Sequence, residues 1–337
     1  MAEQTHRLPA EKGPEAPAQD VQTREDGGHR PYSRVGFETM ARIRYGSLPT
    51  ERSNPRSARL DRLSVTAIAR LMNRVDQDAV RAVGRAAPAI GKAVTEITER
   101  LRAGGRLIFL GAGTSGRLGV LEAAECPPTF NTPPSQVQAV MAGGRRAVFR
   151  SVEGAEDDAG AGARAVRARA RAGDAVVGIA ASGVTPFVRA GLAEARRRGA
   201  LTVLVTCNPS VARSAARIVI PLRVGPEVLA GSTRLKAGTA TKLTLNTLTT
   251  AAFARLGKVH GNRMVDLQPR SAKLLARAIR LVSDLGSVGP ARAASLLGEA
   301  AGRAKVAIVM ARRNVSAAQA RRRLREAGGL LGRAAGI

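Results

Sequence analysis

The sequence predicts an α/β fold in which helices cover both faces of a doubly wound, flavodoxin-like parallel sheet of five strands. Five short apolar runs alternate with helix-like segments, a pattern typical of strands that are buried on both faces. Glycine-rich loops follow the first and third runs, and each loop leads into a helix. The 337 residues also leave room for flanking N-terminal helices and a small C-terminal helical segment.

The chain before the first apolar run divides into a tail and two amphipathic segments. Residues 1–48 mix Pro, Gly, Glu, Gln and Arg without periodicity, and their seven acidic and seven basic residues cancel, so we expect a disordered extension. Residues 49–95 are predicted to form N-terminal helices. One helix begins after Ser64, a favourable N-cap, and a second extends roughly from Ala79 to Arg102 and ends at a Gly-Gly pair.

The apolar runs define the predicted sheet. Residues 96–259 are assigned to the α/β domain, which includes a long helix after Gly231, and residues 260–337 form a C-terminal helical segment with no strand pattern after residue 270. The predicted strands comprise residues 106–110, 137–141, 175–179, 201–205 and 218–222.

The net charge of +28 is a potential clue to function. It arises from 54 Lys and Arg residues against 26 Asp and Glu, and 47 of the basic residues are Arg, scattered over the helix-like segments. Proteins that bind single-stranded nucleic acid interleave basic with aromatic residues, whereas this chain has six Phe, two Tyr and no Trp. The pattern favours a solvated Arg-rich surface over a nucleic-acid site.

Composition also argues against several other classes of protein. No stretch approaches the ~20 apolar residues that cross a bilayer, and residues 1–30 lack the apolar region of a secretory signal, so we expect a cytoplasmic protein without a membrane partner. Cys126 and Cys207 are too few for a disulfide framework and suit a reducing compartment. A Cys/His metal site is not expected, because the chain has only three His and no Cys-x-x-Cys motif.

The loop after the first predicted strand carries hydroxyl groups. Its sequence, Gly111-Ala-Gly-Thr-Ser-Gly116, matches the dinucleotide fingerprint, but the second strand ends without the carboxylate that would hold a ribose. Thr114 and Ser115 lie beside backbone N–H groups at a helix start, an arrangement that suits a compact phosphate monoester. A purely structural glycine turn is the alternative.

The loop after the third predicted strand repeats this design. Ser182 and Thr185 flank Gly183 at a helix start, so both hydroxyls can reach one anion, and Pro186 fits the first helical turn. Alone, this pair could be an ordinary helix cap. Two such loops on parallel strands of one sheet indicate a sugar phosphate rather than a nucleotide as the ligand.

Carboxylates and a third polar segment complete the candidate site. Glu125 precedes a Pro-Pro pair that restricts its backbone, and residues 153–158 contain the one acidic cluster of this basic chain. We expect one carboxylate from each place to face the same ligand as a general acid/base pair. Ser232, in a Ser-Thr cap, and Lys236 lie at a further helix start, where they either support anion binding or belong to the surface.

Together these motifs resemble a known family. Residues 111–130, which contain Gly-Thr-Ser-Gly-Arg and Glu-Cys-Pro-Pro, are similar to the signature of the N-acetylmuramic acid 6-phosphate etherases, members of the sugar isomerase (SIS) domain superfamily. The resemblance extends over roughly residues 50–337. The other matching stretches, in order along the chain, are 152–158, 180–186, 206–209, 225–246 and 256–268.

The resemblance implies a carbon–oxygen lyase. Members of the family cleave the D-lactyl ether of N-acetylmuramic acid 6-phosphate by elimination and then hydration, in amino-sugar catabolism and peptidoglycan recycling, without a cofactor. The products are N-acetylglucosamine 6-phosphate and D-lactate. By similarity, the proton donor is Glu125 and the second catalytic carboxylate is Glu156.

The resemblance also implies how the ligand and a second subunit are held. By similarity to other SIS domains, Ser182 and Thr185 hold the phosphate, Thr114 and Ser115 line the sugar end, and the chain forms a homodimer. Val184 stands where many relatives carry Arg, which removes a possible cation near the phosphate.

Two alternatives share the same ancestry. A sugar-phosphate-binding regulator, like the animal glucokinase regulatory protein, would bind its ligand without converting it. An aldose–ketose isomerase would keep the phosphate loops but lack the two glutamate motifs. The presence of both Glu125 and Glu156 favours the lyase.

Overall fold

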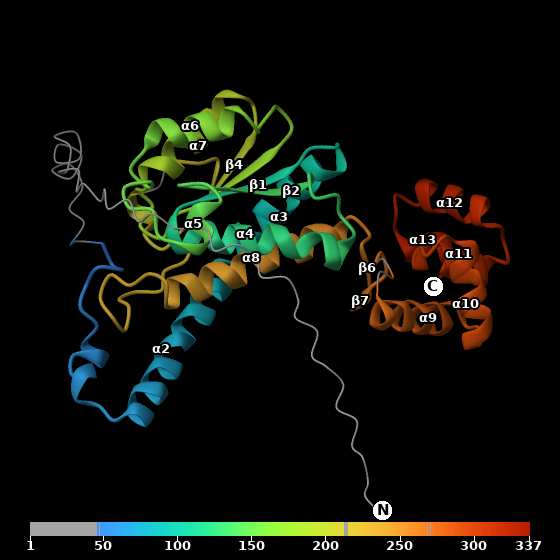
Figure 1. Cartoon of the computed structure of the whole chain (residues 1–337), viewed down its shortest axis with the longest axis horizontal. Helices are drawn as coiled ribbons and strands as arrows, with labels where there is room; N and C mark the ends of the chain where they lie inside the picture. The colour runs from blue at the N-terminus through green and yellow to red at the C-terminus, as the bar shows by residue number, and fades with distance from the viewer. Residues whose placement is uncertain (1–45, 47, 212–214, 268, 270) are drawn as a thin grey trace, which may run out of the picture. The chain divides into compact units, whose positions relative to one another are not determined.

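In the part of the chain that the structure describes, five parallel strands form one sheet in the order β2-β1-β3-β4-β5 (Figure 1). This computed structural model describes residues 46, 48–211, 215–267, 269 and 271–337. The strand order confirms the predicted flavodoxin-like arrangement, and each strand end lies within one residue of its predicted position. The strands are β1 (Leu107–Gly111), β2 (Val137–Met141), β3 (Ala175–Ile179), β4 (Leu201–Thr206) and β5 (Ile218–Pro221).

Helices pack on both faces of the sheet, and alternate residues of each strand enter different cores (Figure 1). Phe109 and Val203 point into the core shared with α3, α4 and α8, whereas Ile108 and Leu204 point into the core shared with α6 and α7. The sheet is therefore doubly wound, as predicted. The helices are α3 (Ala87–Arg102), α4 (Gly113–Phe130), α6 (Ala159–Arg167), α7 (Pro186–Arg197) and α8 (Lys236–Arg255).

The N-terminal helices differ from the prediction in where they divide. The Ser64 Oγ accepts a hydrogen bond from the Ala67 N–H at 3.2 Å, which confirms the predicted cap of α2 (Val65–Arg85). The next helix, α3, starts at Ala87 rather than Ala79, because Pro88 fits only the first turn of a new helix. As α3 extends to Arg102, the predicted domain boundary after residue 95 falls inside a helix.

The predicted disordered extension over residues 1–48 lies outside the described residues, except at Gly46 and Leu48. Leu48 is buried, and its carbonyl accepts a hydrogen bond from the Glu51 N–H at 2.9 Å. Leu48, the last residue of the predicted extension, is therefore part of the folded structure.

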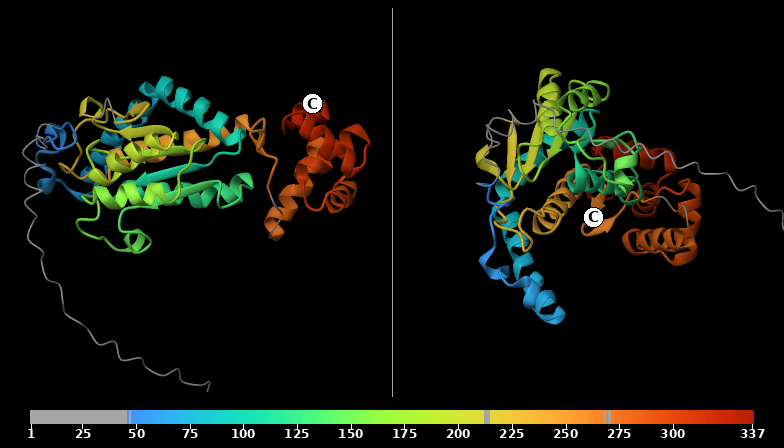
Figure 2. Two further views of the ribbon diagram at one scale, coloured as in Figure 1. Left: turned by 90° about the horizontal axis from the view of Figure 1, so that it is seen from above. Right: turned by 60° about the vertical axis from the view of Figure 1, so that its left-hand side comes forward.

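The C-terminal segment is helical, as expected, and has a core of its own (Figures 1 and 2). One feature of it was not predicted: β6 (Val259–His260) pairs with β7 (Arg263–Met264) in a short antiparallel hairpin around Gly261 and Asn262, residues typical of such turns. No described helix could cross a membrane. The helices are α9 (Ala272–Gly286), α10 (Pro290–Glu299), α11 (Ala304–Arg313), α12 (Ala317–Glu326) and α13 (Leu331–Ala335).

Candidate active site

The first loop places two hydroxyl groups at the start of α4. Thr114 and Ser115 lie in the first turn of this helix, where backbone N–H groups have no carbonyl partner within the helix. A Cβ atom on Gly116 would lie 2.8 Å from the Gly111 carbonyl oxygen, so glycine is needed where β1 packs on α4. The glycines therefore have a structural role, and the helix start that they allow favours an anion.

In the second loop the two hydroxyl groups converge. Ser182 Oγ and Thr185 Oγ1 are 3.5 Å apart, and Ser182 Oγ also accepts a hydrogen bond from the Val184 N–H at 3.3 Å. Gly183 has a φ of 76°, which a residue with a side chain rarely adopts. No side chain caps α7, so this loop is not an ordinary helix cap. Val184, the position of the departure noted above, is buried.

Glu156 lies close to both loops. Its backbone carbonyl accepts a hydrogen bond from the Phe187 N–H at 3.0 Å, in the first turn of α7. It also lines a cavity of about 150 Å³ together with Gly113 and Glu153. Burial, followed by the negative charges of Asp157 and Glu153, raises the pKa of the Glu156 carboxyl above its usual range.

Arg117, which was not predicted as a site residue, holds the segment before Glu156. Its Nε donates to the Val148 carbonyl and its Nη2 to the Ala147 carbonyl, both at 2.9 Å, and it lines the same cavity. These carbonyls belong to α5 (Arg146–Phe149), 30 residues further along the chain. Arg117 follows the Gly-Thr-Ser-Gly motif directly, but no sequence signal identifies backbone carbonyls as its partners.

The acidic cluster also provides a helix cap. The Asp158 Oδ1 accepts a hydrogen bond from the Ala161 N–H at 2.7 Å and caps α6. Asp158 therefore has a structural role as a helix cap. The carboxylates of the cluster that line the cavity are those of Glu153 and Glu156.

Glu125 lies far along α4 from Gly113, the residue of this helix that lines the cavity beside Glu156. It is exposed on α4, 11 residues after Thr114, which corresponds to about 16 Å along the helix axis. Pro127 and Pro128 follow it inside the helix. The expected pairing of Glu125 with a carboxylate of the acidic cluster stays a prediction, and this position on α4 bears on which chain supplies Glu125.

One turn before Glu125, a second glutamate of α4 is buried. Glu122 accepts hydrogen bonds from Thr249 Oγ1 at 2.5 Å and Asn246 Nδ2 at 2.9 Å, both on α8. Burial raises the pKa of this carboxyl, and burial also raises the pKa of the nearby Cys126 thiol to about 12. Glu122 links α4 to α8, and Cys126 is an unreactive thiol at neutral pH.

The third predicted segment differs from expectation. The helix α8 starts at Lys236, and neither Ser232 nor Thr233 caps it; instead the Glu227 carboxylate accepts hydrogen bonds from the Lys236 and Ala237 N–H groups at 3.0 and 2.9 Å. Sequence reasoning assigned Glu227 no role, because a cap from nine residues away leaves no local pattern.

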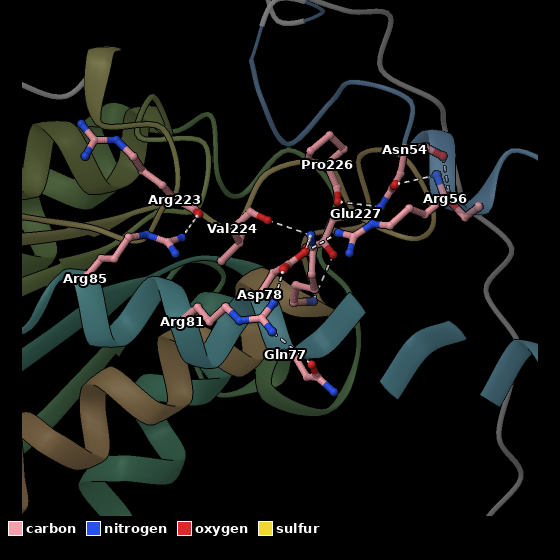
Figure 3. Close-up of polar contacts among 12 residues, drawn as sticks. Asn54, Arg56, Gln77, Asp78, Arg81, Arg85, Arg223, Val224, Pro226 and Glu227 are labelled. Carbon is pink, nitrogen blue, oxygen red and sulfur yellow. Dashed lines mark hydrogen bonds and ion pairs between the residues drawn. The ribbon is translucent and has the colours of Figure 1, made fainter. Parts of the chain in front are cut away.

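Lys236 is fully buried rather than exposed to a ligand. Its Nζ donates to the Val224 carbonyl at 2.7 Å and lies 3.7 Å from Asp78 Oδ2, and Asp78 is also paired with Arg56 (Figure 3). The described geometry therefore gives Lys236 partners inside the protein. Ser232 is half-buried in the loop before α8.

The start of α8 nevertheless lies beside the first loop. A Cβ atom on Gly238 would be 3.7 Å from the Thr114 methyl group, in ordinary van der Waals contact. The segment that carries Ser232 and Thr233 thus approaches the sugar end of the predicted site.

A second cavity of the described structure is lined by none of the predicted site residues. This cavity of about 610 Å³ lies along β5 and is lined by residues such as Pro209, Arg217 and Arg223. No group of three or more His, Cys, Asp or Glu side chains among the described residues is placed to hold a metal ion.

The chain is similar to several known proteins. Residues 89–196 match the glucokinase regulatory protein N-terminal SIS domain family. The phosphoheptose isomerase of Neisseria gonorrhoeae superposes with a TM-score of 0.42 at 19% identity, covering 57% of this chain and 98% of that one. The N-acetylmuramic acid 6-phosphate etherase of Synechococcus sp. (strain CC9605) is 51% identical over 283 residues, which cover 83% of this chain and 90% of the relative. That of Rubrobacter xylanophilus is 51% identical over 284 residues, 83% of this chain and 94% of the relative. The chain belongs to the N-acetylmuramic acid 6-phosphate etherase family.

Proposed function

We propose that this chain is a lyase that cleaves the D-lactyl ether of N-acetylmuramic acid 6-phosphate and releases N-acetylglucosamine 6-phosphate and D-lactate. The observation that carries the proposal is the convergence of the Ser182 and Thr185 hydroxyls at the start of α7, where Glu156 is also attached. Hydroxyls at a helix start suit the phosphate, and a nearby carboxylate suits proton transfer.

The proposed reaction needs a base that removes the proton from C2 and an acid that protonates the ether oxygen on the neighbouring carbon, C3. Opening of the sugar ring exposes a C1 aldehyde, which acidifies the proton on C2. A base removes this proton while an acid protonates the ether oxygen leaving C3, so that lactate departs and a C2–C3 double bond forms. Water then adds to C3 of the unsaturated aldehyde. Glu125 matches the family's proton donor, and Glu156 is the second carboxylate.

We propose a homodimer in which Glu125 of a second copy completes the site. Paired carboxylates that flank a reacting sugar bond lie on the order of 5–9 Å apart, whereas Glu125 is about 16 Å along α4 from Thr114. The exposed face of α4 also carries Leu121, which is 46% exposed and one turn before Glu125. A second copy packed on this face would cover Leu121 and bring its own Glu125 to the cavity beside Glu156.

Location and partners follow from this proposal. Both cysteines are free and buried, which suits a reducing cytoplasm. The small phosphorylated sugar is the proposed partner, and we propose no nucleic-acid partner for the Arg-rich surface.

The Glu153→Gln variant tests the electrostatics of Glu156. The negative charge of Glu153 contributes to the raised pKa of Glu156, so its removal should lower that pKa. We expect the limb of the kcat/KM profile that reports Glu156 to move to lower pH. If Glu156 is the base, this is the limb on which activity falls as pH decreases; if it is the acid, activity falls as pH rises. A profile that does not move would contradict the assigned coupling.

Release of D-lactate is the direct test of the proposed function. Purified chain incubated with N-acetylmuramic acid 6-phosphate should form D-lactate and N-acetylglucosamine 6-phosphate in equal amounts, measured by an enzyme-coupled lactate assay. Binding of the sugar phosphate without lactate release would instead identify a regulator. An aldose–ketose isomerase would interconvert hexose phosphates and leave the ether intact.

A further inference from the structure

The loop that carries Ser182 is held from the end of the neighbouring strand. The Ala181 carbonyl, directly before Ser182, accepts three hydrogen bonds: from the Cys207 N–H and Asn208 Nδ2, both at 3.0 Å, and from Thr206 Oγ1 at 3.3 Å. These donors come from the last residue of β4 and the two residues after it. The position of Ser182 therefore depends on Asn208 through a single peptide group.

The second N–H of the Asn208 amide reaches the N-terminal part of the chain. Asn208 Nδ2 also donates to Thr50 Oγ1 at 3.1 Å, and both side chains are fully buried. The Asn208 Oδ1 accepts no hydrogen bond from the described residues. A buried acceptor without a partner is unfavourable, so the orientation of this amide is determined by its two donor bonds.

Residues 50–57 form a strap that follows the loop before α8. The Thr50 carbonyl accepts a hydrogen bond from the Gly231 N–H at 3.1 Å, Asn54 Nδ2 donates to the Pro226 carbonyl at 3.1 Å (Figure 3), and Ser57 Oγ donates to the Val228 carbonyl at 2.7 Å. The strap thus holds the loop on both sides of Glu227 and directly before Ser232.

We propose that Thr50 and Asn208 are positioning residues that join the phosphate loop to the Ser232 segment and set their separation for one sugar phosphate. The path between the two segments is continuous. Ser182 follows Ala181, whose carbonyl accepts a hydrogen bond from the Asn208 amide, and this amide also donates to the Thr50 hydroxyl. The Thr50 carbonyl in turn accepts a hydrogen bond from the N–H of Gly231, which precedes Ser232. The strap therefore acts on the ligand site through these hydrogen bonds, although it lies more than 120 residues before Ser182. This inference rests on the proposed function, because it takes both segments as contacts of the same sugar phosphate.

A double-mutant cycle on ligand affinity tests this proposal. The affinity of wild type, Thr50→Val, Asn208→Ala and the double variant for N-acetylglucosamine 6-phosphate is measured by calorimetry, with KM, kcat and Tm for each. Thr50→Val keeps the volume and loses only the hydroxyl. We expect each single variant to weaken binding by ~10-fold and to raise KM more than it lowers kcat. The double variant should be no weaker than the worse single variant, because both changes remove the same hydrogen bond.

Two further variants separate positioning from stability. Thr50→Ser restores the hydroxyl and should restore affinity. Thr98→Val makes the same change at a buried threonine of α3 whose hydroxyl donates to the Val94 carbonyl at 2.7 Å, and should leave the Kd within about two-fold. This inference alone would be overturned if wild type binds the sugar phosphate and Thr50→Val binds it with the same Kd. It would also be overturned if the losses of affinity in the two single variants multiply in the double variant. Absence of sugar-phosphate binding by wild type would overturn the proposed function and this inference with it.

Discussion

Mixed dimers of Glu125→Gln and Glu156→Gln chains should recover activity that neither variant has alone. Each variant by itself loses one carboxyl group from every site, and we expect turnover to fall by ~10²-fold or more with ligand affinity largely kept. In a mixed dimer with shared sites, one site receives both Gln residues and the other both natural glutamates. Random pairing makes half of the dimers mixed, so about a quarter of the wild-type activity should return.

The measurement is D-lactate release from dimers purified through two different affinity tags. Tandem purification removes the parental dimers and should raise the recovered activity to about half of wild type, since one site of two is intact. As a matched control, Glu156→Gln is mixed with the Glu125→Gln/Glu156→Gln double variant, which leaves no intact site. Failure of verified mixed dimers to recover activity would place both carboxylates in the site of one subunit and reject the shared site.

The strands could be predicted closely because their signal is local. Each is a run of four to six mostly apolar residues, a length and composition typical of strands in a sheet that helices cover on both faces. The division between α2 and α3 had no such signal. Ala79, Ala82 and Ala86 are all buried, so the apolar pattern continues through the break, and only Pro88 marks the start of α3.

The candidate site could be predicted where one loop supplies the groups. The hydroxyls of Ser182 and Thr185 converge because Gly183 lies between them and a helix starts directly after Thr185, all within residues 182–186. Interactions that depend on tertiary structure were missed. The carbonyl partners of Arg117 and the cap that Glu227 provides for α8 join segments whose proximity only the fold creates.

The distance of Glu125 from the Thr-Ser loop has the same origin. The sequence places Glu125 shortly after the Thr-Ser loop, but a helix converts 11 residues into about 16 Å. The sequence alone suggests that the two glutamates act together within one chain, whereas the length of α4 between Glu125 and the Thr-Ser loop led to the proposal that a second copy supplies Glu125. The family resemblance points to both glutamates but does not indicate which subunit of the proposed dimer each acts in.

Replacing Glu227 by Ala should cause the largest loss of stability among these variants, about 3–5 kcal/mol in the free energy of unfolding. Glu227 is fully buried, and its two carboxylate oxygens accept the first free N–H groups of α8. Its removal leaves two buried donors unpaired and takes one negative charge from the surroundings of the buried Lys236. Thermal unfolding should shift down on the order of 10 °C.

The matched control is Glu299→Ala. Glu299 pairs with Arg292 at 3.1 Å, but both side chains are about half exposed, so we expect a change within about 0.5 kcal/mol. Urea unfolding at neutral pH measures both variants. A loss of less than about 1 kcal/mol for Glu227→Ala would show that α8 does not depend on this carboxylate for its cap.

Lys236→Met then distinguishes the buried cluster from a ligand contact. Met fills a similar volume, and Asp78 keeps its partners Arg56 and Arg81 when the cation is removed, so the cost should be smaller than for Glu227→Ala. Because the Nζ already bonds to the Val224 carbonyl inside the protein, affinity for N-acetylglucosamine 6-phosphate should stay close to wild type. Lost affinity with an unchanged Tm would mean that Lys236 leaves the cluster to meet the phosphate, as the sequence alone had led us to consider.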